Sequence, residues 1–418
     1  MNKNILKQLN NAKKASISFG LLPHAKRILI LQNLAKELRK NKRLIIKANS
    51  KDFKKNAQNN PMRDRLLLND ARIESMAKEI ENLIKIKDPI GQIFDCRNRF
   101  GLKICRKKVP IGVIGVIYES RPNVTTDVTA ICIKSGNAVI LKGGKEARES
   151  YIVLHKLIKR ALILSKADPE VVQFIDPKIK NTVLDIISAN SLVDVIIPRG
   201  SSGLINFVRE NATVPVIETG AGVCHTYVDD EALLNSSAKI IFNAKTQRPS
   251  VCNALDTALI HKKIAKDFLS KMTKLLVEKK VEIFADTESF KILKNHYPKN
   301  LLKRASLSDF GREFLSQKMS IKIVSGIDEA IKFISKYSSK HSEAILTENK
   351  KNAERFLKEI DAAVVYVNAS TRFSDGAIFG LGSEIGVSTD KIHARGPMGP
   401  NEMTIYKWIV SGNYNVRK

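Results

Sequence analysis

A reactive cysteine is the first chemical feature that the sequence offers. Cys252 follows a polar segment that contains Lys245 and Arg248, and an apolar run over residues 254–260 comes after it. Nearby cations stabilise the thiolate, which is the nucleophilic form of cysteine. The pattern favours a nucleophile at Cys252. The alternative is a buried structural cysteine, which is the commoner state of this residue type.

The other four cysteines fit the structural alternative better. They are Cys96, Cys105, Cys132 and Cys224, and no two cysteines of the chain are spaced as a CxxC pair. The odd total and this spacing indicate neither a disulfide framework nor a zinc site. We therefore expect no disulfide, no metal and a reducing, cytoplasmic compartment, since the first residues also lack the apolar segment of a signal peptide.

Two glycine-rich loops could bind an anion. Lys142, Gly143 and Lys145 belong to a loop between a predicted strand and helix, and Gly200 and Ser201 belong to a second loop of the same kind. Glycines allow the backbone to approach a ligand closely, and a helix N-terminus favours negative charge. Both loops are candidate phosphate sites, although an ordinary turn with solvated lysines explains the first equally well. The Walker A and GxGxxG patterns are absent.

The elements around these loops alternate between strand and helix. Short apolar, β-branched runs predict strands over residues 113–118, 138–141, 171–174, 193–197 and 214–218, with helices between most of them. Such alternation predicts a parallel sheet with helices on both faces, and ligands bind at the carboxyl ends of its strands. Each charged or glycine-rich loop lies at such an end.

The remaining segments complete an α/β protein. Residues 1–90 show the apolar spacing of helices, and a second strand–helix series runs over residues 253–367. Residues 93–109 resemble a hairpin, and residues 404–410 form an apolar terminal strand. The sequence predicts two doubly wound α/β domains and a small β arm.

The charge of the chain permits two interpretations. Its net charge is +29, which could indicate nucleic-acid binding or attraction for anionic substrates. The lysines are scattered over helical stretches and are not interleaved with aromatic residues, so we favour the second interpretation and expect no nucleic-acid partner. No uncharged apolar run reaches the roughly 18 residues of a membrane span, so we expect no membrane partner.

Five segments resemble the aldehyde dehydrogenase superfamily, and within it the branch that reduces an acyl phosphate. They are VPIGVIGVIYESRPNVTTDV, VILKGGKEA, ETGAGVCHTYVD, NAKTQRPSVCNALDT and STRFSDGAIFGLGSEIGVST with KIHARGPMG. The resemblance implies a cofactor-binding domain over residues 1–93 and 114–220, a catalytic domain over 221–400, and an oligomerisation arm over 94–113 and 401–418.

The resemblance also implies a reaction. L-glutamyl 5-phosphate would be reduced by NADPH to L-glutamate 5-semialdehyde and phosphate, through a thioester on Cys252, in proline biosynthesis. The chain would form a homo-oligomer, and whether a glutamate 5-kinase partner delivers the acyl phosphate stays open. The catalytic residues implied are Cys252 and Asn123, whose side-chain amide would bind the developing oxyanion.

Binding residues follow from the same matches. Lys145 falls where NAD-using relatives carry a glutamate for the ribose 2′-hydroxyl, so the resemblance implies NADP(H). Glu218 matches the general base of hydrolytic members, but a reductase that releases phosphate needs no such base, and a structural or cofactor-side role is open. The cofactor-binding residues implied are Lys142, Gly143, Lys145, Gly200, Ser201, Glu218 and Glu313. The substrate-binding residues implied are Arg121, Arg248, His225, His393 and Arg395.

Two other functions remain as alternatives. A hydrolytic, NAD-dependent aldehyde dehydrogenase would use Glu218 as its base, whereas the basic Arg248 beside Cys252 suits a phosphate. A non-enzymatic RNA-binding protein would show binding that weakens steeply with salt.

Overall fold

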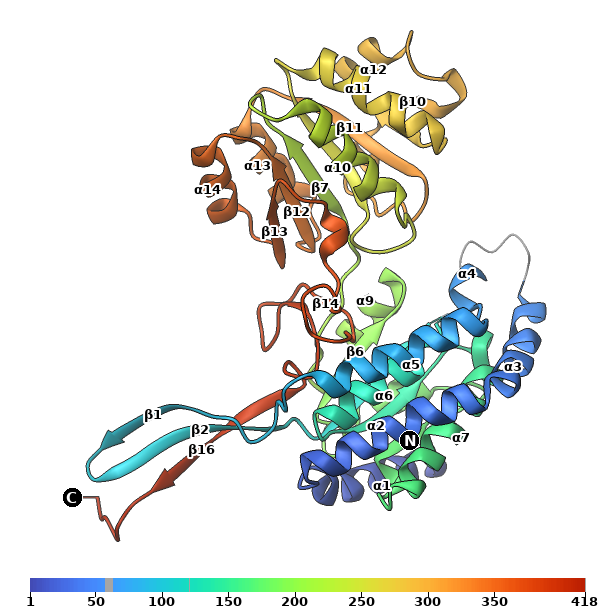
Figure 1. Ribbon diagram of the computed structural model, residues 1–418, viewed down its shortest axis with the longest axis vertical. Coiled ribbons are helices and arrows are strands. Elements are labelled where there is room, and N and C mark those ends of the chain that lie inside the picture. Colours follow the sequence, from blue (N-terminus) through green and yellow to red (C-terminus); the bar gives the residue numbers. More distant parts are fainter. Residues whose placement is uncertain (57–62, 120, 418) are drawn as a thin grey trace. The chain divides into compact units, whose positions relative to one another are not determined.

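The chain forms two compact units in the computed structural model, which describes residues 1–56, 63–119 and 121–417. Unit 1 comprises Met1–Thr219, Phe379–Gly386 and Ile392–Lys418, and unit 2 comprises Gly220–Ile378 and Val387–Lys391 (Figure 1). The predicted catalytic domain, 221–400, thus differs from unit 2 at residue 220 and at residues 379–386 and 392–400. Residues 57–62, 120 and 418 fall in the predicted helical region, the loop after the first strand and the arm, and lie outside the described residues.

Unit 1 is built on a four-stranded parallel sheet. Its strands are β3 (Val113–Tyr118), β4 (Ala138–Lys142), β5 (Val172–Phe174) and β6 (Val195–Arg199), in the order β5-β4-β3-β6. Lys142 pairs with Ile117, and Arg199 pairs with Tyr118, so the ends of three neighbouring strands meet at one edge of the sheet. The loops that follow β3, β4 and β6 therefore lie next to one another, as predicted.

The prediction of a fifth strand in this sheet is wrong. Residues 214–218 form only an isolated bridge between Ile196 and Val216. Pro215 has no backbone N–H to donate to a ladder, and the chain passes into unit 2 four residues after Val216. A short apolar run was therefore not sufficient to extend the sheet.

Helices cover this sheet because each carries an apolar stripe. Ile30, Leu31, Leu34 and Leu38 of one helix are completely buried at the spacing of a single helix face. The predicted helical character of the N-terminal region is confirmed for its described residues. The helices of unit 1 are α1 (Lys3–Phe19), α2 (His24–Lys40), α3 (Lys42–Lys55), α4 (Arg63–Leu66), α5 (Asp70–Lys85), α6 (Val124–Lys134), α7 (Arg148–Leu164), α8 (Thr182–Ile187) and α9 (Ser202–Asn211).

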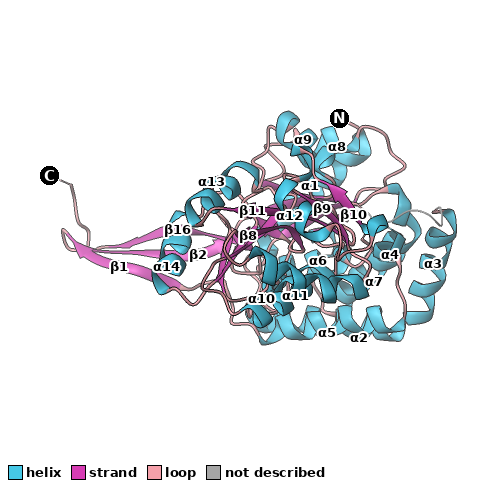
Figure 2. Ribbon diagram, turned by 90° about the horizontal axis from the view of Figure 1, so that it is seen from above, coloured by secondary structure: helices cyan, strands magenta, loops and turns pink. Residues whose placement is uncertain are grey.

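A separate three-stranded antiparallel sheet also belongs to unit 1. It consists of β1 (Ile93–Arg99), β2 (Leu102–Pro110) and β16 (Thr404–Ser411), and we call it the arm. Its strands lie side by side in the order β1-β2-β16 (Figure 2). Tyr406, Trp408 and Val410 of β16 are 41%, 47% and 54% exposed, at alternate positions and hence on one face of the strand. The predicted hairpin and terminal strand are confirmed, and they pair with each other.

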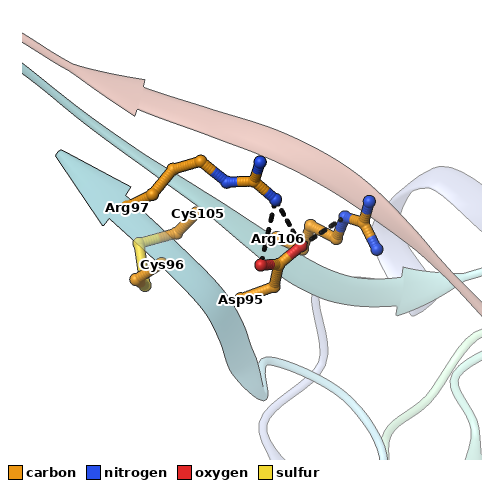
Figure 3. Close-up of a disulfide and its surroundings, with 5 residues drawn as sticks. All are labelled: Asp95, Cys96, Arg97, Cys105 and Arg106. Carbon is orange, nitrogen blue, oxygen red and sulfur yellow. Dashed lines mark hydrogen bonds and ion pairs between the residues drawn. A yellow bond between two sulfur atoms is a disulfide. The ribbon is translucent and has the colours of Figure 1, made fainter. Parts of the chain in front are cut away.

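The arm contains a disulfide, which corrects the expectation that the chain has none. Cys96 on β1 is bonded to Cys105 on β2, with Cα atoms 4.2 Å apart (Figure 3). The register of the two strands shifts between Phe94 and Arg97, so Cys96 lies at an irregularity of the ladder. The spacing of the cysteines could not show this pair, because the shift decides which residue of β1 faces Cys105.

Unit 2 is built on a seven-stranded parallel sheet in the order β10-β9-β11-β8-β7-β12-β13. Its strands are β7 (Cys224–Val228), β8 (Leu255–His261), β9 (Glu282–Ala285), β10 (Leu302–Arg304), β11 (Lys318–Val324), β12 (Ser342–Leu346) and β13 (Val364–Val367). Its helices are α10 (Leu234–Thr246), α11 (Ala265–Glu278), α12 (Thr287–Leu293), α13 (Ile327–Tyr337) and α14 (Lys350–Glu359). Two further short strands are β14 (Val387–Ser388) in unit 2 and β15 (Gly396–Pro397) in unit 1.

Alternate residues of the central strands of unit 2 face two different cores. Ala258 and Ile260 of β8 join the core formed with α10 and α11, whereas Leu259 joins the core formed with α13 and α14. Because successive side chains of a strand point to opposite faces, helices cover both faces of this sheet. The predicted doubly wound α/β architecture is confirmed. Within the described ranges, every helix is too short or too polar to span a bilayer.

Candidate active site

Cys252 is the accessible free thiol of the chain. It lies in the loop between α10 and β8 and is half-buried, whereas the other two free cysteines, Cys132 and Cys224, are completely buried. Burial raises the pKa of both buried thiols well above the usual range. These two thiols therefore stay protonated and unreactive at neutral pH, which leaves Cys252 as the candidate nucleophile.

The backbone of Cys252 is held from one side by Gly222 and Cys224, where the chain enters β7. Gly222 packs directly against the carbonyl group of Cys252, so that a β-carbon at position 222 would overlap it. The Sγ of Cys224 donates to the carbonyl oxygen of Cys252 over 3.2 Å, and the N–H of Gly222 donates to Glu313 Oε1 over 3.0 Å. Glu313, a predicted cofactor-binding residue, thus supports the cysteine loop through Gly222.

A buried ion pair lies at the base of this loop. Lys245 Nζ donates to the carbonyl oxygen of Leu255 over 2.7 Å and lies 3.7 Å from Asp256 Oδ1. Asp256 also accepts from the backbone N–H groups of Phe314 and Cys224, over 3.0 and 3.4 Å. Burial raises the pKa of Asp256 to about 6, and burial lowers the pKa of Lys245. Lys245 is committed to this pair, so Arg248 is the exposed cation of the predicted segment.

The first glycine-rich loop follows β4 in unit 1. Lys142 Nζ donates to the carbonyl oxygen of Gly143 over 3.0 Å, and burial lowers the pKa of Lys142. Gly143 has the ring of Tyr151 where a β-carbon would lie, so this position requires glycine. Lys145 is exposed at the start of a 3₁₀ turn, Lys145–Ala147, directly ahead of α7. The cation Lys145 therefore lies just before the N-terminal end of α7.

The second loop follows β6 and already holds an anionic group. Ser201 is the N-cap of α9, and its side chain accepts from the N–H of Leu204 over 3.4 Å. The backbone N–H of Ser201 donates to the carboxylate of Glu119 over 2.9 Å, and Gly200 leaves room for that carboxylate. This end of α9 thus binds a negative group of the chain itself, and pyrophosphate binding there stays a prediction.

Asn123 lies at the end of the loop that follows the third adjoining strand, β3. It occupies the N-cap position of α6, and its side-chain amide donates to Asp127 Oδ2 over 2.8 Å. Asp127 is buried, and burial raises its pKa to about 8. One N–H of the amide is oriented by Asp127, and an amide has a second N–H that can serve an oxyanion.

The other predicted residues occupy varied positions. In unit 1, Glu218 Oε1 lies 3.8 Å from Arg209 Nε of α9, and His393 Nε2 lies 2.6 Å from the carbonyl oxygen of Glu402. Arg121 and Arg395 of the same unit are half-buried. In unit 2, His225 is fully buried within β7, where its Nδ1 lies 3.1 Å from Glu343 Oε2. His225 is therefore enclosed in the core of unit 2.

Sequence reasoning missed Arg372 as a site residue. Its side chain donates from Nε to Gln247 Oε1 over 2.8 Å and from Nη1 to Asn253 Oδ1, on the loop that carries Cys252. The STRFSDG segment contains it, but it lies 120 residues after Cys252. Only the fold brings the two together.

Comparisons with known proteins agree with this architecture. The model of the family described as "Aldehyde dehydrogenase family" matches residues 2–289, and the chain belongs to this family of oxidoreductases, which use a nicotinamide cofactor. The gamma-glutamyl phosphate reductase of Chlorobium phaeobacteroides (strain BS1) is 46% identical over 418 residues, which is the whole length of both chains. That of Legionella pneumophila subsp. pneumophila (strain Philadelphia 1) is 47% identical over 420 residues, again over both full lengths.

A similar solved structure is also that of a gamma-glutamyl phosphate reductase. The crystal structure of gamma-glutamyl phosphate reductase from Thermotoga maritima has a TM-score of 0.93 and 43% sequence identity, and the match covers 99% of this chain and all of that one. Within the aldehyde dehydrogenase family, the chain falls in the group of gamma-glutamyl phosphate reductases. The resemblance drawn from the sequence is confirmed.

Proposed function

We propose that the chain reduces L-glutamyl 5-phosphate to L-glutamate 5-semialdehyde and phosphate, with NADPH, in the biosynthesis of proline. The observation that carries this proposal is the half-buried Cys252, the accessible free thiol. Its loop contains the cation Arg248 and accepts a hydrogen bond from Arg372. The full-length relatives named for this activity support the choice of substrate.

The chemistry assigns a covalent step to Cys252. Its thiolate forms a bond to the acyl carbon, the bond from that carbon to the phosphate oxygen breaks, and phosphate leaves with the electron pair. NADPH, when bound, supplies the hydride that reduces the thioester. The Asn123 amide stabilises the negative charge that develops on the acyl oxygen. The tetrahedral adduct then collapses to the aldehyde, and the thiolate of Cys252 is released.

The residues of unit 1 fit a cofactor with phosphate groups. The N-terminus of α9 at Gly200 and Ser201 accepts a carboxylate in the structure, so its N–H groups suit a pyrophosphate. Lys142 would hold the ribose, and Glu218 is assigned to the cofactor side, as is Glu313 of unit 2. Glu218 is next to Arg209, and because phosphate release needs no hydrolytic water, the reaction requires no base there.

The reaction is best tested in reverse. We expect NADP⁺ to be reduced when L-glutamate 5-semialdehyde and inorganic phosphate are both supplied, and we expect no reduction when phosphate is omitted. Absorbance at the NADPH band measures the rate. Oxidation to glutamate that proceeds at full rate without phosphate would instead support a hydrolytic aldehyde dehydrogenase.

Lys145 should decide the choice between NADPH and NADH. A 2′-phosphate gains a charge-assisted contact from an ammonium group, worth roughly 1.5–3 kcal/mol or about tenfold to a hundredfold in affinity, and a 2′-hydroxyl does not. The neighbouring Arg148 is engaged by Asp176 over 2.7 and 2.5 Å, which leaves Lys145 as the exposed cation of this loop. Lys145→Glu should therefore lower kcat/KM for NADPH by at least that factor and spare NADH.

A lysine on the same helical segment provides the control for this prediction. Lys156 is exposed on α7, and Lys156→Glu makes the same change of charge outside the loop. We expect Lys156→Glu to leave the ratio of kcat/KM for the two cofactors unchanged. The same unchanged ratio in Lys145→Glu would contradict the assignment of Lys145.

The arm should bind a second copy of the chain. Apolar side chains in a row on an edge strand, such as Tyr406, Trp408 and Val410, are usually covered by another chain. We expect at least a dimer by light scattering at micromolar concentration, and Val410→Glu should shift it towards monomer because it places a charge in the row. Leu357→Glu on α14 is the matched control, because Leu357 is 49% exposed and Val410 is 54% exposed. A wild-type chain that is monomeric and fully active would refute the prediction.

A further inference from the structure

The segment that follows β13 is tied to both sides of Cys252. Arg372 lies in the 3₁₀ turn Thr371–Phe373 and donates to Gln247 and Asn253, which precede and follow the cysteine. In return, Thr371 Oγ1 donates to the carbonyl oxygen of Asn253 over 2.8 Å, and Asn253 Nδ2 donates to the carbonyl oxygen of Ser374 over 2.9 Å. These reciprocal bonds fix the guanidinium of Arg372 against the cysteine loop.

Two arginines belong to the surroundings of the cysteine loop, Arg372 through its hydrogen bonds and Arg248 through its place in the sequence. Arg248 belongs to the same loop. Burial lowers the pKa of Arg372, and the charge of Arg248 lowers it further. Cys252 and Asp375 act on the pKa of Arg372 in the opposite direction. Because Arg372 donates to Asn253, the residue after Cys252, its guanidinium lies beside the cysteine loop. Two like charges held near each other favour an anion between them.

Arg372 also retains donors for a ligand. A guanidinium carries five N–H groups in a planar fork, and one from Nε and one from Nη1 point at Gln247 and Asn253. In the part of the chain that the structure describes, three N–H groups remain. A fork of this kind binds a phosphate through two parallel hydrogen bonds, which a lysine cannot do.

We propose that Arg372, together with Arg248, binds the phosphoryl group of the acyl phosphate while Cys252 attacks the neighbouring carbon. This inference rests on the proposed function. The phosphate oxygen is bonded to the acyl carbon, so a substrate whose carbon reaches Cys252 Sγ must place its phosphoryl group beside the same loop. The two guanidinium groups neutralise the charge on the departing phosphate, and Arg372 is thus a substrate-binding residue.

The kinetics of the reverse reaction test the assignment. In Arg372→Gln, KM for inorganic phosphate should rise by about tenfold to a hundredfold, as expected for loss of a bidentate charged contact. KM for L-glutamate 5-semialdehyde should change by less than about twofold, because the contacts of the semialdehyde itself are not altered. Arg372→Lys keeps the charge without the fork and should give an intermediate KM for phosphate. Arg304→Gln is the control, because Arg304 is an exposed arginine that stacks on Phe290.

Alkylation of Cys252 provides a readout that does not need turnover. Iodoacetamide should label Cys252 and spare the buried Cys132 and Cys224, as measured by mass spectrometry of the peptides. Inorganic phosphate should slow labelling of the wild type and of Arg304→Gln, and it should have little effect on Arg372→Gln. If the wild type showed no phosphate-dependent turnover but phosphate still protected Cys252, the proposed function would fail and the anion site would stand.

Two results would overturn the inference. One is a wild-type KM for phosphate in Arg372→Gln, together with full protection of Cys252 by phosphate. The other is a raised KM for the semialdehyde with an unchanged KM for phosphate, which would assign Arg372 to the carboxylate of the substrate. The melting temperature of each variant, with Arg372→Lys as the conservative change, separates either result from loss of folding.

Discussion

Cys252→Ser should abolish reduction of the acyl phosphate while leaving NADPH binding nearly unchanged. A serine hydroxyl is not ionised at neutral pH and cannot replace the thiolate, so we expect kcat to fall on the order of 10⁴-fold or more, as in other enzymes that lose a covalent nucleophile. Steady-state rates in both directions measure the loss, and titration of NADPH fluorescence measures cofactor binding.

Cys224→Ser is the matched control for this experiment. Cys224 is the neighbouring free cysteine, and its Sγ donates to the carbonyl oxygen of Cys252 over 3.2 Å. Because a serine hydroxyl can donate the same hydrogen bond, the loop should keep its shape and the variant most of its activity. An active Cys252→Ser variant and an inactive Cys224→Ser variant would show that the nucleophile had been assigned to the wrong cysteine.

The four strands of the parallel sheet of unit 1 were each predictable from a short apolar run. Residues 113–118 coincide with β3, and residues 138–141 with β4 except for its last residue. Local composition fails where pairing depends on a distant partner. Residues 214–218 have the composition of a strand, but Pro215 cannot complete a ladder. β12 (Ser342–Leu346) lies within the predicted second series, and its buried polar residues Ser342 and Glu343 differ from the apolar composition that marks a strand.

In the candidate site, too, local features were predictable and contacts between distant segments were not. The context of Cys252 is local, because Arg248 lies four residues before it, and so this residue could be singled out from the sequence. The role of Gly222 against the carbonyl of Cys252 and the bonds of Arg372 to its loop are tertiary contacts between separate segments. No local pattern shows them. The disulfide of Cys96 and Cys105 was missed for a related reason, since the irregular register of the hairpin decides it.

The polar contacts of unit 2 explain why this loop is built from several segments. Lys245 and Asp256 form a buried pair that also receives the backbone of Phe314 and Cys224. Removing one partner of a buried pair leaves an uncompensated charge, so the pair fixes the positions of these segments relative to one another. The nucleophile is therefore placed by the core of unit 2, although its own loop is polar and partly exposed.

Asn123→Ala should lower kcat on the order of 10²- to 10³-fold, which corresponds to roughly 3–4 kcal/mol for the loss of one oxyanion donor. The amide interacts with charge that develops only in the transition state, so KM for the acyl phosphate should change little. Asn123→Asp should be slower still at neutral pH, because a carboxylate has no N–H to donate and repels the oxyanion. Steady-state kcat and KM for the three proteins measure this order.

Asp127 gives the prediction a second, positioning test. The amide of Asn123 donates to Asp127 Oδ2 over 2.8 Å, and Asp127 is buried. Asp127→Asn retains an acceptor for this bond and should keep most of the activity, whereas Asp127→Ala releases the amide and should lower kcat by less than Asn123→Ala does. Asn10→Ala on the exposed face of α1 is the control, because the side chain of Asn10 donates to the carbonyl oxygen of Leu6 in the same helix. A wild-type kcat in Asn123→Ala would remove this residue from the oxyanion site, and the order of the Asp127 variants would then reflect folding alone.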